Sequence, residues 1–148
     1  LDVYVVALEG DGEARPLPGA SGDGRASYFP RYSPDGRWIA FVRSDGGYFA
    51  RPSSDLFLVP ASGGDARRLS VNTSGRMDSW PSWSLDGHWL VWASRRDDSP
   101  NTRVFFTEID PTGGCSPPVP FPGHVPEGMS VNHPTISSFP RPAKLLVD

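Results

Sequence analysis

The sequence is poor in the residue types that mark several classes of protein. Its 148 residues include one cysteine, Cys115, so the chain cannot form an internal disulfide or a cysteine-based zinc or haem site. It has three histidines and no recognisable spacing of metal ligands, and we expect neither a metal nor a cofactor. The apolar run at residues 3–8 is too short for a signal peptide or a membrane span. We therefore expect no membrane span in this chain.

Charge of one sign is also lacking. Lysine and arginine number 14 and aspartate and glutamate 17, for a formal net charge of −3. The basic residues are scattered, so the electrostatic footprint of a nucleic-acid-binding protein is absent. By contrast, 17 prolines and 16 glycines, with few long helix-forming runs, predict a chain of many turns and little helix.

One stretch occurs twice and organises the chain. Residues 29–41 read FPRYSPDGRWIAF and residues 80–92 read WPSWSLDGHWLVW, so matched positions lie 51 apart (80 − 29) without a gap. In each copy an Asp-Gly turn separates two apolar and aromatic runs, which is typical of a β-hairpin. Both faces of the second run are apolar, which places Trp38, Trp83, Trp89 and Trp92 in the core between neighbouring sheets.

A second type of hairpin alternates with the first. Residues 2–17 match residues 55–69, with starts 53 apart (55 − 2), and a third copy begins at residue 104. A period on the order of 40 to 50 residues, made of short strands, is typical of propeller blades. We therefore predict an all-β fold, a partial β-propeller of antiparallel four-stranded blades. Its units are an outer hairpin at 2–17, blades at 28–70 and 79–121, and the start of a further blade at 132–148.

These units amount to about three blades, whereas closed propellers typically have about four to eight. The chain also begins inside a predicted strand. We expect missing blades of the same protein, or another subunit, to complete the ring.

The repeat resembles that of a known family. The pattern Pro-x-x-Ser-Pro-Asp-Gly at 30–36, followed by Asp-Leu-Phe-Leu-Val at 55–59 and Gly-Gly at 63–64, resembles the WD-type repeat of TolB-like β-propellers. Residues 76–91 and 105–119 are similar to the last full blade of bacterial envelope members. The resemblance implies a rigid periplasmic or surface-exposed scaffold that binds proteins or peptides and has no catalytic activity.

Two other functions remain open at this point. The chain could be a structural subunit of a membrane-bound complex, in which neighbours complete its blades. It could also be the propeller domain of a peptidase whose catalytic domain lies outside this chain. The sequence has no Gly-x-Ser-x-Gly nucleophile motif, so we expect no catalytic residues within it.

Binding residues are expected in the long connections, which a propeller gathers on one face. These connections are 43–55, 70–79, 94–103 and 121–133. From three of them we predict a partner-binding set, with loop packing or self-paired charges as the alternative: Tyr48, Phe49, Arg51, Arg76, Asp78, Arg95, Arg96 and Asp97. A second set, expected at the mouth of the central channel or as plain packing, takes the position before the strand proline in each copy: Phe29, Trp80 and His133.

Overall fold

The computed structural model describes residues 1–10, 12–47, 51–97, 100–123 and 125–136, and over these residues it contains strands and loops but no helix. The strands are β1 (Tyr4–Val6), β2 (Ala14–Pro16), β3 (Ala26–Tyr32), β4 (Trp38–Ser44), β5 (Asp55–Pro60), β6 (Arg67–Arg68), β7 (Asp78–Trp83), β8 (Trp89–Ser94), β9 (Arg103–Glu108) and β10 (Val119–Pro120).

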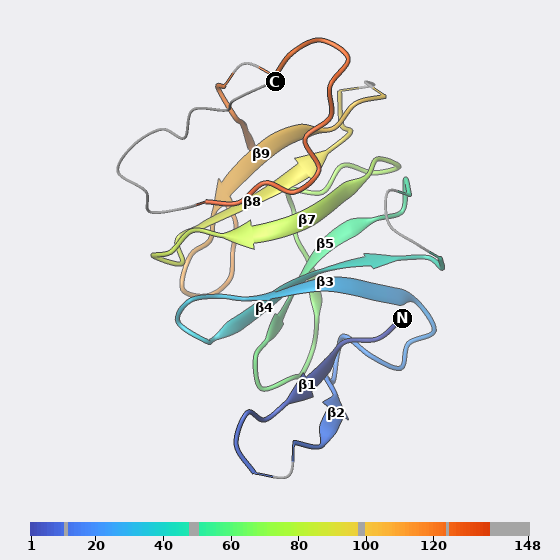
Figure 1. Cartoon of the computed structure of the whole chain (residues 1–148), viewed down its shortest axis with the longest axis vertical. Coiled ribbons are helices and arrows are strands. Elements are labelled where there is room, and N and C mark those ends of the chain that lie inside the picture. Colours follow the sequence, from blue (N-terminus) through green and yellow to red (C-terminus); the bar gives the residue numbers. More distant parts are fainter. Residues whose placement is uncertain (11, 48–50, 98–99, 124, 137–148) are drawn as a thin grey trace, which may run out of the picture.

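These strands form three antiparallel sheets (Figure 1). The sheets have the orders β1-β2, β3-β4-β5-β6 and β10-β9-β8-β7. In both four-stranded sheets, neighbours in sequence are neighbours in space, as in a propeller blade. The predicted all-β partial propeller of antiparallel four-stranded blades is confirmed.

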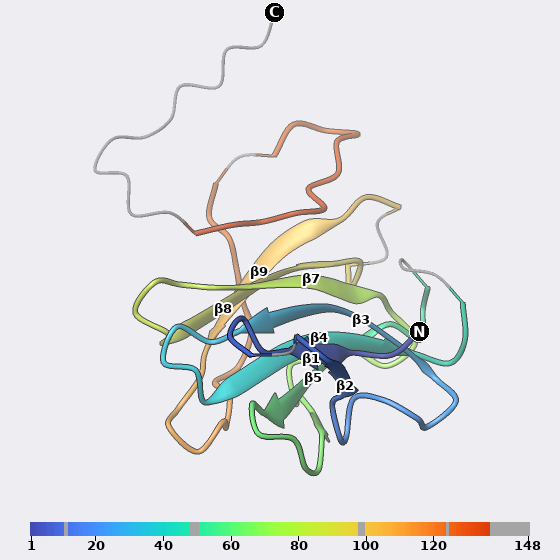
Figure 2. The same cartoon turned by 60° about the horizontal axis from the view of Figure 1, so that its bottom comes forward.

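The three sheets stack in chain order (Figures 1 and 2). Each junction between them is apolar. Between the two four-stranded sheets, Ala40 and Leu58 of the first pack with Leu90 and Trp92 of the second. The indole of Trp83 also crosses this junction and donates a hydrogen bond of 3.1 Å to the Arg31 carbonyl. The second four-stranded sheet therefore packs against one face of the first.

The other face of the first sheet is covered by the β1-β2 hairpin. Phe41 and Val59 pack there with Val3 and Leu17, and all four are buried. Because side chains alternate along a strand, β4 presents Ala40 to one neighbour and Phe41 to the other. This explains why the strand is apolar at nearly every position.

The Asp-Gly turn has the same geometry in both blades. The Ser33 hydroxyl donates to Asp35 at 2.6 Å, and the Trp38 amide donates to the Ser33 oxygen at 3.0 Å. The copy at Ser84 and Asp86 repeats these contacts at 2.5 and 2.9 Å. Leu85, which stands where the first copy has proline, is exposed and leaves the turn unchanged.

Two expectations about individual segments require correction. Trp83 and Trp92 are buried as predicted, but Trp38, the first residue of β4, is only half-buried. Trp89 is 37% exposed, because β8 and β9 have no further described sheet over their outer face. The further blade expected from residue 132 would begin with an inner strand, yet residues 131–136 form no strand. A strand needs a run of hydrogen bonds to a neighbouring strand, and no strand in the described part of the chain pairs with this segment.

The different settings of two tryptophans give a first prediction. Trp92→Ala should lower the free energy of unfolding by about 3–5 kcal/mol, since the ring is fully buried between the sheets. Trp89→Ala should cost less than about 2 kcal/mol, because much of that ring already contacts solvent. Urea unfolding of both variants measures the difference. Equal losses would contradict the assignment of strand faces.

The Asp35 turn predicts a defined pH dependence. Hydrogen bonds from the Ser33 hydroxyl and the Arg37 amide, followed by the Arg37 side chain, lower the pKa of Asp35 from 3.8 to about 2. A depressed pKa means that this carboxylate stabilises the folded state above pH 3.8 and that the contribution is lost as the pH falls towards 2. Asp35→Asn should therefore be less stable than wild type at pH 6, and the difference should shrink at pH values approaching 2. A constant difference across this window in denaturant titrations would contradict the prediction.

Candidate functional site

Both inner strands carry a β-bulge at the same position of the repeat. The pairs Tyr28↔Val42 and Arg31↔Ala40 leave two residues of β3 opposite one residue of β4. In the second blade the pairs Ser79↔Ala93 and Ser82↔Val91 leave the same imbalance. Each bulge contains a proline, which has no N–H to donate to the ladder and is tolerated in a sheet at such a site.

The bulges place two large aromatic residues in a left-handed backbone conformation. The φ angle is 54° at Phe29 and 55° at Trp80, and these are the non-glycine residues with positive φ in the described part of the chain. For a residue with a Cβ this conformation costs about 1–2 kcal/mol. Strain of this kind persists where surrounding contacts hold it, and it often accompanies a functional position.

These strained residues form an aromatic cluster with His133. The rings of Phe29 and Trp80 stack with centroids 5.7 Å apart, and His133 lies 5.2 Å from Trp80 and 6.1 Å from Phe29. The structure thus brings together the three residues that the sequence places at the channel mouth. Between them is a cavity of about 30 Å³, the size of one water molecule. A larger ligand would have to contact the outer edge of this cluster.

The long loops lie together at one end of the sheets, opposite the Asp-Gly turns (Figure 1). Backbone hydrogen bonds join them in series: the Asp78 amide donates to the Ser54 carbonyl at 2.8 Å, and the Arg95 amide donates to the Met77 carbonyl at 2.9 Å. We call this end the loop face and define it by residues 45–47, 51–54, 70–77, 95–97 and 100–102.

Two of the predicted binding residues are engaged inside the protein. Asp78 is fully buried and forms an ion pair of 2.9 Å with Arg96. The same carboxylate accepts a hydrogen bond of 2.8 Å from the Trp92 indole and one of 2.9 Å from the Thr73 amide. The Arg96 guanidinium also lies 4.2 Å from the centre of the Phe105 ring. Asp78 and Arg96 therefore fasten the loops to the second blade, and we do not place them in the binding surface.

The other predicted residues differ in accessibility. Arg51 and Asp97 are exposed, whereas Arg76 and Arg95 are half-buried. The Nε atom of Arg95 is buried and has no hydrogen-bond partner within the described ranges. Tyr48 and Phe49 lie outside the described residues.

A polar cavity of about 540 Å³ that the sequence analysis missed lies where the loop face, through residues 45, 52–53 and 74–75, meets the ends of the first blade's strands. Three arginines line it with Asp45 and Asp55, and the Phe57 ring forms part of its wall: Arg25, Arg43 and Arg68. These arginines stand near the ends of strands β3, β4 and β6. Charged residues at the loop-face ends of predicted strands are the signal that could have found this cavity.

Arg43 is the buried member of the three arginines that line the cavity. Its side chain is 6% exposed and lies 3.3 Å from Asp23, and its guanidinium carbon lies 4.8 Å from the centre of the Phe57 ring. Burial lowers the pKa of Arg43, but the Asp23 carboxylate opposes this effect. Burial alone would raise the pKa of Asp23. The hydrogen bond from the Arg25 amide and the positive charges of Arg43 and Arg25 outweigh the effect of burial, so the pKa of Asp23 is lowered. Each group therefore favours the charged form of the other.

Two further features were sought in the described residues. No group of three histidine, cysteine, aspartate or glutamate side chains within them is arranged to hold a metal ion. These residues likewise contain no helix with the length and hydropathy of a transmembrane span.

This architecture is similar to that of solved structures of other proteins. No protein-family model matches the sequence, and no curated protein matches it either. A solved structure assigned as TolB from Agrobacterium tumefaciens is similar to this chain, with 26% sequence identity and a TM-score of 0.60. The match covers 80% of this chain and 40% of the chain in that structure. The structure of TolB from Acinetobacter baumannii is similar as well, with 22% sequence identity and a TM-score of 0.55. That match covers 78% of this chain and 26% of the chain in the TolB structure. The chain thus spans less than half the length of either structure.

The sheets define a partial β-propeller of four-stranded blades. Within that class, the two matches show a TolB-like propeller segment, as the repeat motifs imply.

The positive φ angles predict that glycine is tolerated better than alanine at Phe29, which is the reverse of the usual preference within a strand. At Phe29, replacement by glycine should leave the protein more stable than replacement by alanine, by about 1 kcal/mol, because alanine keeps the left-handed strain. At Tyr32, an exposed residue of the same strand without positive φ, alanine should be the better replacement. Thermal or urea unfolding of the four variants provides the comparison. Alanine being better at both positions would show that Phe29 is not held in this conformation in solution.

Proposed function

We propose that this protein is a non-catalytic β-propeller scaffold that binds a protein or peptide at its loop face in the bacterial cell envelope. The likeness to two TolB structures supports the fold and, through it, a periplasmic or envelope location. The observation that carries the binding role is the polar cavity of about 540 Å³, placed where fastened loops meet.

The chemistry of this cavity suits a peptide better than a simple ion. Arg68 is already paired with Asp55 through two hydrogen bonds of 2.7 and 2.9 Å, and Arg43 is paired with Asp23. Fixed pairs of opposite charge leave little net attraction for an anion alone. They do present both donors and acceptors, which a peptide backbone with polar side chains can satisfy, and Phe57 adds an apolar wall.

Rigidity supports the same proposal. The loops that carry the cavity are tied to the sheets by the Asp78–Arg96 pair and by the backbone bonds from Asp78 and Arg95. A surface that is already ordered loses less conformational entropy on binding. Arg25 and Asp45 are exposed residues of the cavity lining, and Arg51 is an exposed loop-face residue of the predicted partner-binding set, next in sequence to the lining residue Pro52.

Panning a random-peptide display library on the immobilised chain, followed by fluorescence anisotropy with the enriched peptides, tests the proposal. The variant carrying Arg25→Ala, Asp45→Ala and Arg51→Ala should bind them at least about tenfold more weakly, since arginine contacts often dominate protein interfaces. The three side chains are exposed, so the fold should be retained.

A matched control removes the same charges elsewhere. Arg15, Arg37 and Asp65 are exposed and lie away from the loop face, and their replacement by alanine should leave affinity unchanged. Failure to enrich any peptide, or an equal loss of affinity in both triple variants, would refute binding at the loop face.

A further inference from the structure

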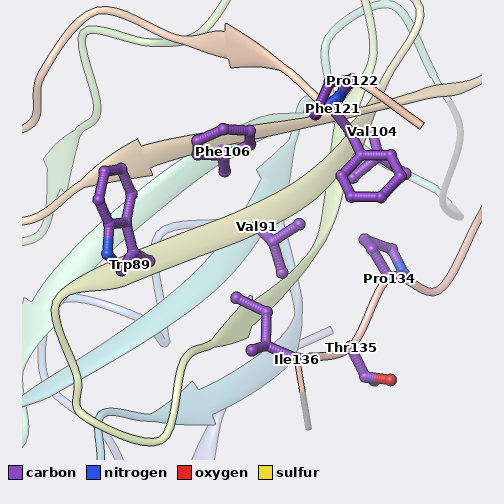
Figure 3. Close-up of a pocket in the computed structure, with 9 residues that line it drawn as sticks. All are labelled: Trp89, Val91, Val104, Phe106, Phe121, Pro122, Pro134, Thr135 and Ile136. Carbon is purple, nitrogen blue, oxygen red and sulfur yellow. The ribbon is translucent and has the colours of Figure 1, made fainter. Parts of the chain in front are cut away.

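The polar cavity at the loop face lies between segments of the chain that the structure describes. Arg25 comes from the segment that leads into β3, and Ser74 and Gly75 come from the segment that leads into β7. The apolar hollow on the outer face of β8 and β9 is different, because it lies where a further blade would stack (Figure 3). The polar cavity is bounded without a further blade, and its own charges indicate which group of a peptide it accepts.

Two arginines of this cavity share one carboxylate. The Nε atom of Arg25 donates to an Asp23 oxygen at 3.1 Å, and the Nε atom of Arg43 lies 3.3 Å from the same oxygen. Arg68 differs, because two of its nitrogens donate to separate oxygens of Asp55, at 2.7 and 2.9 Å. Arg25 and Arg43 together therefore keep one positive charge that no second carboxylate of the described residues pairs with.

The Phe57 ring in the cavity wall lies beside both of these guanidinium groups. Its centre is 5.9 Å from the guanidinium carbon of Arg25 and 4.8 Å from that of Arg43. An aromatic face attracts a guanidinium and leaves the N–H groups in the guanidinium plane available for hydrogen bonds. Arg43 is held further by its hydrogen bond to the Gly19 carbonyl. The two groups are thus ordered in advance, as a bidentate contact with a carboxylate requires.

The electrostatics of Arg43 agree with a local shortage of negative charge. Burial lowers the pKa of Arg43, the Asp23 carboxylate raises it, and the positive charge of Arg25 lowers it again. A second carboxylate beside both guanidinium groups would offset the repulsion between them. Asp45 also lines the cavity and forms no ion pair within the described ranges. The lining as a whole is therefore nearly balanced, and the attraction for an anion is confined to Arg25 and Arg43.

We propose that the cavity recognises a carboxylate of the bound peptide, which enters beside Arg25 and Arg43 and completes a set of two guanidinium groups and two carboxylates. This inference rests on the proposed peptide binding at the loop face and names the group recognised there. An aspartate or glutamate side chain and a C-terminal carboxylate offer the same chemistry. A peptide also meets the other donors and acceptors of the cavity, which a free anion such as acetate does not.

The peptides enriched by panning provide the probes. Each is synthesised in its parent form, with an amidated C-terminus, and with every aspartate and glutamate replaced by asparagine and glutamine. One of these two neutralisations should lower the affinity at least about tenfold in fluorescence anisotropy, and it identifies the source of the carboxylate. Peptides that bind the loop face equally well in all three forms would overturn this inference and leave the proposed function intact.

Variants of the protein test whether Arg25 contacts that carboxylate. Arg25→Gln should weaken binding of the parent peptide about tenfold and leave binding of the neutralised peptide nearly unchanged. Arg37→Gln is the matched control, because Arg37 also donates to an aspartate two residues earlier, Asp35, but lies at the turns opposite the loop face. Its affinity should equal that of wild type. An equal loss for both peptide forms in Arg25→Gln would show that Arg25 only shapes the cavity, which contradicts the inference.

Asp23→Asn should change the affinity in the opposite direction. Removing this charge leaves both guanidinium groups without a carboxylate and strengthens their attraction for that of the peptide, while the asparagine oxygen can still accept from the Arg25 amide. The affinity for the parent peptide should rise severalfold, with little change for the neutralised form. Circular dichroism verifies that the variant is folded. An unchanged or lower affinity in the folded variant would refute recognition of a carboxylate at this position.

Discussion

Each blade sheet is apolar on both faces, and the rest of the structure depends on the need to cover them. In β4, Ile39 and Phe41 face one neighbour while Ala40 and Val42 face the other, and none is more than 1% exposed. A side chain of this kind gains about 1.5–3 kcal/mol when it is fully buried. No sheet of this type is stable alone, so blades must stack.

Stacking also creates the polar arrangement at the loop face. When the sheets meet, the loops that join their strands crowd at one end, and Asp78 becomes buried there with Arg96. A buried carboxylate is costly unless it is paired and hydrogen-bonded. Asp78 meets this condition through Trp92 and Thr73 as well as Arg96. Removing Arg96 would leave the charge unpaired, and it would also remove the hydrogen bond from Arg96 to the Val71 carbonyl in the neighbouring loop.

How much the sequence could predict depends on how local each feature is. The Asp-Gly turns and most strands follow from neighbouring residues, and Ser33 and Asp35 make the contacts that such a turn requires. The burial of Trp89 could not be predicted, because it depends on whether another sheet covers β8. Asp78 and Arg96 looked like surface charges, since nothing local shows that they meet across 18 residues. Their pairing is a consequence of tertiary packing.

The strained bulges show why the meeting of three equivalent residues could be found from sequence while their backbone conformation could not. Three copies of one residue before a proline share a place in the repeat, so a stacked fold must bring Phe29, Trp80 and His133 together. The left-handed backbone at Phe29 and Trp80 contradicts the preference of bulky residues. It is tolerated because the bulge places a proline where no ladder donor is needed, and because the stacked rings bury apolar surface. His133 joins this stack although residues 131–136 form no strand. Aromatic contacts alone therefore hold His133 against the bulges of the two blades.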